Sequence, residues 1–168
     1  MERPLTRVGI TGHMDLTDDT VDLIRAALRD HLKPLASTGR LQGISCIAAG
    51  ADSLFAEVVL ELGGTLIVVL PSADYRATKV KPQHADQFDA LISKAAQVIT
   101  MPHEHANRAA YEAANLEVLS SCDRLVAVWD GQSPADQGGT GAVVEQARVA
   151  GLDTTIVWPD GATRKPKQ

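Results

Sequence analysis

The chain has 168 residues, of which 45% are hydrophobic and 22% are charged, and its formal net charge is -5. This composition is typical of an ordinary globular protein and predicts a single domain over residues 1–160, followed by a flexible polar tail over 161–168. The acidic balance argues against nucleic acid or a membrane surface as a partner. No hydrophobic run reaches the length of a membrane span and no secretory leader is recognisable, so the expected location is the cytoplasm.

The chain alternates short β-branched runs with helical patterns, which is the order typical of a parallel α/β sheet. Strands are expected over residues 7–11, 44–48, 65–70, 97–101, 125–129 and 154–158. A first helix is expected from Thr17 or Asp18, closed by Pro34 and Gly39, and further helices over 52–62, 86–96, 105–121 and 142–150. The handedness of parallel crossovers then predicts a doubly wound, mainly parallel sheet of about six strands flanked by helices.

Ligands of such sheets bind beyond the carboxyl ends of the strands. The turn after the first strand contains Gly12, which would allow close backbone approach, and His13, which could donate a hydrogen bond to a ligand. A tight turn with an exposed histidine explains the same residues equally well. The turn after the second strand contains Gly50 and Asp52. Asp52 either caps the following helix or accepts hydrogen bonds from ribose hydroxyls, and the two roles are compatible.

The segment from residue 71 to residue 83 is long enough to suggest a lid or a binding loop. Arg76, Lys79 and Lys81 concentrate positive charge there. Arg76 is the candidate phosphate clamp, because a guanidinium group pairs with anions through two parallel hydrogen bonds. A solvated loop with ordinary lysines is the alternative for Lys79 and Lys81.

The strongest signal is the glycine-rich run at 129–141, which joins the fifth strand to a helix start. Glycines and unpaired helical N–H groups together suit a small anionic ligand. Farther back, Tyr111 and Asn115 share one face of a helix and either point at this pocket or pack locally. The ligand-binding candidates are Gly12, His13, Gly50, Asp52, Arg76, Asn115, Asp130, Gly131, Gly138, Gly139, Thr140 and Gly141.

The sequence predicts no reactive cysteine, metal site or bound cofactor. Cys46 and Cys122 lie in or beside hydrophobic runs and are predicted to be buried free thiols. His103 and His105 have no third ligand nearby in the sequence, so no metal site is expected. The dinucleotide fingerprint and the Walker lysine are both absent, and no cofactor is expected.

The motifs TGH, AAGADSLFAE and CDRLVAVWDGQSPADQGGTGAVVEQA resemble the SLOG superfamily, the Rossmann-like group that contains the LOG phosphoribohydrolases and the DprA-like proteins. The resemblance covers roughly residues 6 to 158 and is closest to the small single-domain members thought to bind nucleotides. It implies a parallel sheet with the ligand over Gly12, Gly50, Asp52 and the turn at 138–141.

The chain departs from the catalytic motifs that this resemblance brings with it. The LOG motif is PGGxGTxxE, and the similar nucleoside deoxyribosyltransferases carry DxGTxxE. Here no proline precedes the glycines, Val143 holds the place of the nucleophile, and Glu145 is the first carboxylate of the helix. The leading hypothesis is therefore a nucleotide-binding or sensing domain. The alternative is an N-glycoside hydrolase or nucleoside transferase that uses Glu145 or Asp130. A third possibility is an interaction module that forms a homodimer.

Overall fold

The computed structural model describes residues 4–132 and 139–166. Over these residues, six parallel strands form one sheet in the order β4-β3-β2-β1-β5-β6. The strands are β1 (Leu5–Gly12), β2 (Arg40–Ser45), β3 (Thr65–Leu70), β4 (Gln97–Thr100), β5 (Arg124–Val128) and β6 (Asp153–Val157).

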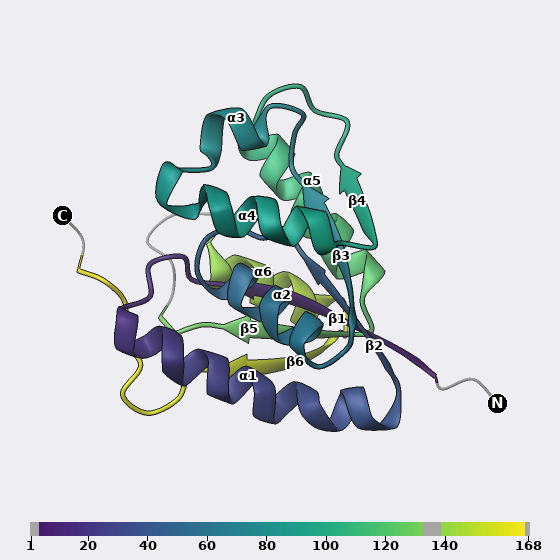
Figure 1. Ribbon diagram of the computed structural model, residues 1–168, viewed down its shortest axis with the longest axis vertical. Coiled ribbons are helices and arrows are strands. Elements are labelled where there is room, and N and C mark those ends of the chain that lie inside the picture. The colour runs from purple at the N-terminus through teal and green to yellow at the C-terminus, as the bar shows by residue number, and fades with distance from the viewer. Residues whose placement is uncertain (1–3, 133–138, 167–168) are drawn as a thin grey trace.

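Helices cover both faces of this sheet (Figure 1). They are α1 (Asp18–Thr38), α2 (Ala51–Glu61), α3 (Tyr75–Lys79), α4 (Pro82–Lys94), α5 (Arg108–Ser121) and α6 (Thr140–Val149). The helices α1, α2 and α4 lie together on one face, and α5 and α6 cover the other. The prediction of a doubly wound α/β sheet is confirmed.

The direction of the winding changes between β1 and β5. From β1 the chain moves outward through β2 and β3 to β4, and α5 then returns it to β5 on the other side of β1. The carboxyl ends of β1 and β5 lie side by side, and Gly12 pairs with Val128 there. In open α/β sheets this switch in strand order leaves a crevice at the carboxyl edge, which is where ligands bind.

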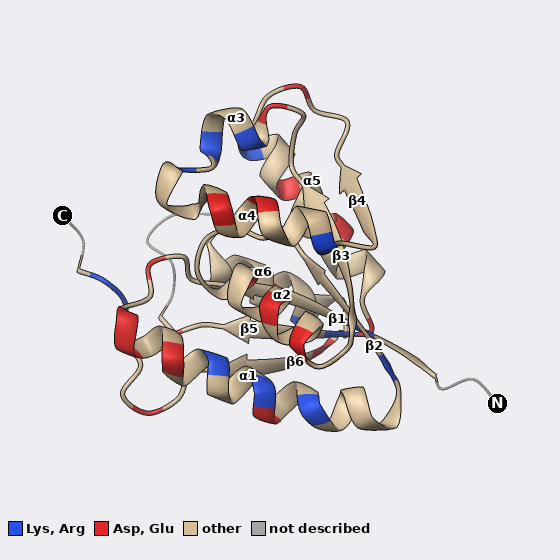
Figure 2. Ribbon diagram, viewed as in Figure 1, with Lys and Arg blue, Asp and Glu red and all other residues tan. Residues whose placement is uncertain are grey.

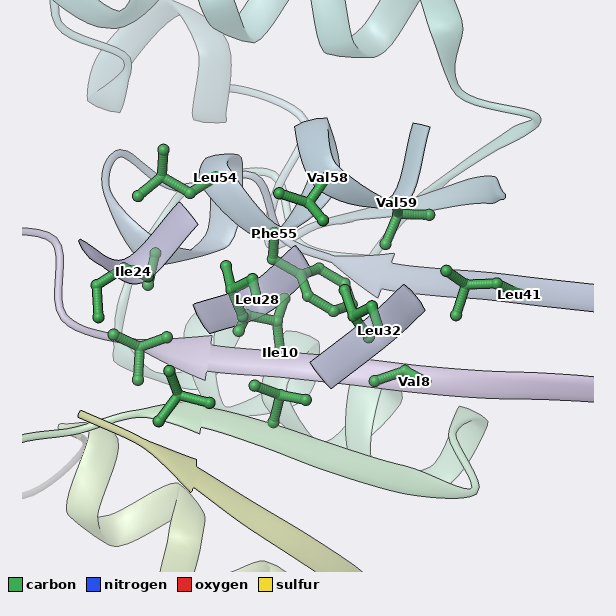
Figure 3. Packing of buried hydrophobic residues seen from close by; sticks show 14 of the residues in the cluster. Val8, Ile10, Ile24, Leu28, Leu32, Leu41, Leu54, Phe55, Val58 and Val59 are labelled. Atoms are coloured by element: carbon green, nitrogen blue, oxygen red, sulfur yellow. The ribbon is translucent and has the colours of Figure 1, made fainter. Parts of the chain in front are cut away.

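The core beneath the first face is built by α1 and α2. Ile24, Leu28 and Leu32 follow one another at four-residue spacing along α1, and all three are completely buried. Phe55 of α2 lies among them above β1 (Figure 3). Each such side chain contributes about 1.5–3 kcal/mol by leaving water. This packing fixes the start of α2, and with it Asp52, against the end of β1.

Most element boundaries differ from the sequence prediction by a few residues, and two of the differences have a local cause. The second strand was expected over 44–48, but β2 ends at Ser45, because the Ser45 hydroxyl accepts from the Ile47 N–H and donates to the Asp52 carbonyl. These bonds turn the chain out of the sheet. Pro34 was expected to close the first helix, but it lies inside α1. It lies on the exposed face, so the carbonyl that it leaves without a partner can be solvated.

Residues 161–166 were expected to be a flexible polar tail, but in the structure Thr163 and Arg164 of this segment contact the body of the protein. The Thr163 N–H donates to the Thr20 hydroxyl at 2.8 Å, and the Thr163 carbonyl accepts from the Thr17 N–H at 3.3 Å. Arg164 forms a β-bridge with Leu16. The segment therefore lies against the loop between β1 and α1, held by polar contacts that its composition does not reveal. Within the described residues, no helix is long and apolar enough to cross a membrane.

Candidate ligand-binding cleft

A cleft of about 780 Å³ opens at the carboxyl edge of the sheet, over the ends of β1, β2, β3 and β5. The start of α6 and one face of α5 complete its walls. Among the residues predicted from the sequence, the cleft brings together Gly12, His13, Asp52, Asn115, Asp130, Gly139, Thr140 and Gly141. The winding switch between β1 and β5 is therefore an open, polar cavity.

Four predicted residues lie outside this lining: Gly50, Arg76, Gly131 and Glu145. The Arg76 guanidinium instead pairs with Asp89 through two hydrogen bonds of 2.8 and 3.1 Å, so it is not positioned as a phosphate clamp. The Glu145 side chain is exposed on α6, whereas Val143 lines the cleft. Gly138 lies outside the described residues.

Gly12 and Gly50, in the turns after β1 and β2, allow neighbouring segments of the chain to pack closely against their backbone. A Cβ on Gly12 would lie 2.5 Å from the Ala51 Cβ and 2.8 Å from the Val128 Cβ. Gly50 has φ +82°, and a Cβ there would lie 2.7 Å from the His13 carbonyl oxygen. The Ala51 N–H donates to that same carbonyl. The amides of the Gly50 turn therefore bind the neighbouring loop, and only Gly12 of this pair borders the cleft.

His13 joins the ends of β1 and β5. Its N–H donates to the Val128 carbonyl at 3.1 Å, and its ring Nε2 accepts from the Asp130 N–H at 3.1 Å. Burial, and then the charge of Arg164, lower the pKa of His13. Both observations indicate a neutral ring, which also packs edge-on against Trp158 with the centroids 5.6 Å apart. The sequence prediction gave His13 a donor role toward a ligand, but its Nε2 is occupied as an acceptor within the protein.

Asp130 supplies an ionised carboxylate to the cleft. Burial alone would raise the pKa of Asp130, but the hydrogen bond from the Gln132 N–H and the charge of Arg164 bring it below its ordinary value. The Arg164 guanidinium lies 3.6 Å from Asp130 and donates to both Asp15 oxygens at 2.9 and 3.1 Å. The C-terminal segment therefore contributes a cation to the cleft.

The turn that carries Asp52 is held in a strained conformation. Ile47 has φ 46°, which is unusual for a β-branched residue, and it is completely buried. The Ser53 hydroxyl donates to the carbonyls of Ile47 and Ala48, and the His84 ring contacts the Ile47 carbonyl at 3.0 Å. Such strain persists only where surrounding contacts overdetermine it, and here it orients the first turn of α2 toward the cleft.

Two tyrosines and a lysine border the same end of the cleft as Asp52. Tyr75 of α3 is buried and meets Tyr111 of α5 edge-on, with the ring centroids 6.3 Å apart. Lys79, one turn after Tyr75, lines the opening and has no ion pair with any residue in 4–132 or 139–166. Burial raises the pKa of the half-buried Cys46 thiol, so this cavity-lining cysteine is protonated and unreactive at neutral pH.

The start of α6 borders the end of the cleft that lies away from Asp52. Gly139 is its N-cap, and the Gly139 carbonyl accepts from Ala142 and Val143. The N–H groups of Thr140 and Gly141 belong to the first turn, where an α-helix offers no acceptor, and they have no backbone partner among the described residues. These N–H groups border an open cavity and suit an anion.

A second hollow of about 740 Å³ lies between α1, α2 and α4. Its arginines already pair with its glutamates, in the Arg25–Glu57 contact of 3.3 Å and the Arg29–Glu61 contact of 2.8 Å. Within the part of the chain that the structure describes, no three metal-binding side chains cluster. The cleft at the sheet edge is the stronger candidate site.

The comparisons with known proteins identify the fold. No protein-family model matches the chain, and no curated protein matches it. DNA processing protein A (DprA) from Streptococcus pneumoniae is similar with a TM-score of 0.68 and 16% identity, over 94% of this chain and 52% of that protein. DprA from Helicobacter pylori, described as having a unique single-stranded DNA binding mode, is similar with a TM-score of 0.65 and 18% identity, over 96% of this chain and 69% of that protein. The Moco carrier protein from Chlamydomonas reinhardtii is similar with a TM-score of 0.56 and 20% identity, over 93% of this chain and 76% of that protein.

The chain therefore shares the Rossmann-like fold of these proteins, which is the fold that the sequence resemblance implied. It spans about half the length of the Streptococcus pneumoniae protein. At these identities the likeness establishes the arrangement of sheet and helices, and the ligand has to be argued from the cleft itself.

Proposed function

We propose that this protein binds a nucleotide or a nucleotide-derived small ligand in the cleft at the carboxyl edge of its sheet. The observation that carries the proposal is the position of the first turn of α6, which borders a cavity at the winding switch and whose first N–H groups have no backbone partner among the described residues. Lys79 and Arg164 bring two cationic side chains to the same cavity. A phosphate is favoured by both the N–H groups and the helix dipole.

The size and polarity of the cleft support a ligand larger than a bare phosphate. A volume of about 780 Å³ falls within the range of small-molecule sites, roughly 300–1,000 Å³. The walls also carry the carboxylates of Asp15 and Asp130, so a polyanion would meet repulsion. A ligand with one phosphate group and a hydroxyl-rich sugar matches this mixture of donors and acceptors.

A nucleotide panel tests the proposal directly. A mononucleotide present at a hundredfold excess over its Kd should stabilise the protein by about 2.7 kcal/mol. For a chain of this size the melting temperature then rises by roughly 5–10 °C. Failure of every nucleoside monophosphate, ADP-ribose and NAD-related compound to shift the melting temperature at millimolar concentration would contradict the proposal.

Replacing Thr140 by proline removes one N–H group from the proposed phosphate site. Proline is well tolerated at the first position of a helix, and Gly139 already has an extended conformation that suits a following proline. Because a hydrogen bond to a charged group contributes about 1.5–3 kcal/mol, we expect Thr140→Pro to weaken nucleotide binding roughly tenfold to a hundredfold in calorimetry. Thr140→Ala is the matched control, since it removes the hydroxyl but keeps the N–H group. Equal affinities of the two variants would place the phosphate elsewhere.

The enzymatic alternative, cleavage or transfer at an N-glycosidic bond, has Asp130 in its favour, because that carboxylate is ionised and lines the cleft. Glu145 is exposed and lies outside the lining. If the protein releases free base from nucleosides or their monophosphates, Asp130→Asn should lower the rate at least a hundredfold, and Glu145→Gln should leave it unchanged. Chromatographic detection of the free base measures the rate of each variant. A rate that depends on Glu145 would overturn this assignment.

The charge distribution argues against nucleic acid as the ligand, although one similar structure is described as having a single-stranded DNA binding mode. The net charge is -5. In α1 most of the acidic residues lie in the first turns and the basic residues in later turns (Figure 2), where Arg25 and Arg29 pair with Glu57 and Glu61 of α2. We therefore expect a Kd weaker than about 100 µM for a labelled single-stranded oligonucleotide at physiological salt. Anisotropy that saturates at low micromolar protein would refute this expectation.

A further inference from the structure

The end of the cleft over β2 and β3 differs in chemistry from the end over β1 and β5. It carries Asp52 from the first turn of α2, Tyr75 from α3 and Tyr111 from α5, together with the Cys46 thiol. Lys79 lines the opening of this end, and none of the other groups suits a phosphate. Among the described residues, no cationic side chain lies within ion-pairing distance of Asp52.

The Asp52 side chain is half-buried in the wall of the cleft and lacks the partners that a carboxylate needs there. A buried carboxylate is costly unless hydrogen-bond donors satisfy its oxygens. The donor nearby is the Ala48 backbone, whose hydrogen bond offsets only part of the effect of burial. A ligand with two adjacent N–H donors would satisfy both carboxylate oxygens in the bidentate geometry that carboxylates favour.

We propose that this end of the cleft is a subsite for a guanine-type base, whose two adjacent N–H donors bind the Asp52 carboxylate while its ring packs against Tyr75 and Tyr111. The inference rests on the proposed function, because the phosphate of the same ligand lies over the start of α6. The two ends are separated by about two strand spacings, roughly 10 Å. That span matches the reach of a mononucleotide from its 5′-phosphate to the far edge of its base.

The ionisation state of Asp52 links this subsite to pH. Burial raises the pKa of Asp52 to about 7. The other titratable groups at this end, Cys46, Tyr75 and Tyr111, have raised pKa values and stay neutral there. Further charged or titratable neighbours of the turn are His13 and Asp15 after β1, Lys79 on α3 and His84 on α4. A ligand that binds the carboxylate therefore displaces a proton from Asp52 below pH 7.

Calorimetry with GMP, IMP and AMP at pH 8 and pH 6 tests the subsite. The three share one phosphate, so its own titration cancels in their ratios. IMP lacks the exocyclic amino donor, and AMP offers an acceptor where guanine offers its ring N–H donor. Since each lost bond to a charged acceptor lowers affinity roughly tenfold or more, we expect GMP to bind most tightly, then IMP, then AMP. The preference for GMP over AMP should fall roughly tenfold from pH 8 to pH 6.

Two variants separate the base subsite from the phosphate site. Asp52→Asn should abolish the preference for GMP and its pH dependence, and Asp86→Asn, which removes an exposed carboxylate on α4, should preserve both. Equal binding of all three nucleotides, or tighter binding of AMP, would overturn the base subsite and leave the proposed function intact. Absence of binding by any of the three would overturn both. The comparison of GMP, IMP and AMP on the wild-type protein tests the base subsite even if Asp52→Asn folds poorly.

Discussion

Gly12→Ala is expected to lower the free energy of unfolding by about 2–3 kcal/mol, with a fall in melting temperature of roughly 5–10 °C. The added Cβ would lie 2.5 Å from the Ala51 Cβ and 2.8 Å from the Val128 Cβ. Neither neighbour has a flexible side chain that can turn away, so the start of α2 and the end of β5 must move apart. Because both border the cleft, nucleotide affinity should fall together with stability.

Gly151→Ala provides the matched control for Gly12→Ala. Gly151 has φ +74°, but nothing lies within 4 Å of a Cβ built there. Its replacement therefore introduces backbone strain of about 1–2 kcal/mol without a steric clash, and nucleotide affinity should be unchanged. Denaturant unfolding of both variants measures the difference. A loss in Gly12→Ala that is smaller than the loss in Gly151→Ala would show that the contact between β1, α2 and β5 is not tight.

Asp52→Asn is expected to stabilise the protein at pH 8. Because the folded protein raises the pKa of Asp52 from 3.8 to about 7, it binds more protons than the unfolded chain between these values. The free energy of unfolding of the wild type therefore falls as pH rises from about 4 to about 7 and then levels off. Asparagine does not ionise, so the variant avoids a cost on the order of 2–4 kcal/mol above pH 7.

The measurement is the difference in unfolding free energy between Asp52→Asn and the wild type as a function of pH. It should be largest above pH 7 and should shrink toward pH 4. Asp86→Asn should show no such trend, because Asp86 is exposed. A wild type that is more stable than Asp52→Asn at pH 8 would mean that the carboxylate already has sufficient partners. The expected gain in stability at the expense of binding is typical of a residue retained for function.

The sequence was sufficient to predict the fold and the edge of the sheet at which the candidate cleft lies. Hydrophobic β-branched runs such as 65–70 have the same boundaries in the structure as in the prediction. Parallel strands end at one edge, so residues that follow β1 and β5 had to meet, and Gly12 does pair with Val128. The glycine-rich start of α6 was visible because glycines and a following amphipathic helix leave a local signal.

The sequence could not reveal which charged side chains reach the cleft. Arg76 appeared available because its partner Asp89 lies on the next helix, thirteen residues away. Arg164 was assigned to a frayed tail because its contacts with Asp15 and Asp130 depend on how the C-terminal segment folds back. Such long-range pairs leave no periodic signal in a single sequence. Tyr75 was missed because the short helix α3 was predicted as part of a loop.

Amide chemical shifts during a titration with GMP test the central claim most directly, since the claim concerns particular N–H groups. We expect the largest changes at Thr140 and Gly141 in the first turn of α6, with further changes at Gly12 and at Asp52. Residues around the second hollow, such as Arg25 and Glu57, should stay unaffected. Saturable shifts confined to that hollow, with the signals of Thr140 and Gly141 unchanged, would contradict the assignment of the ligand site.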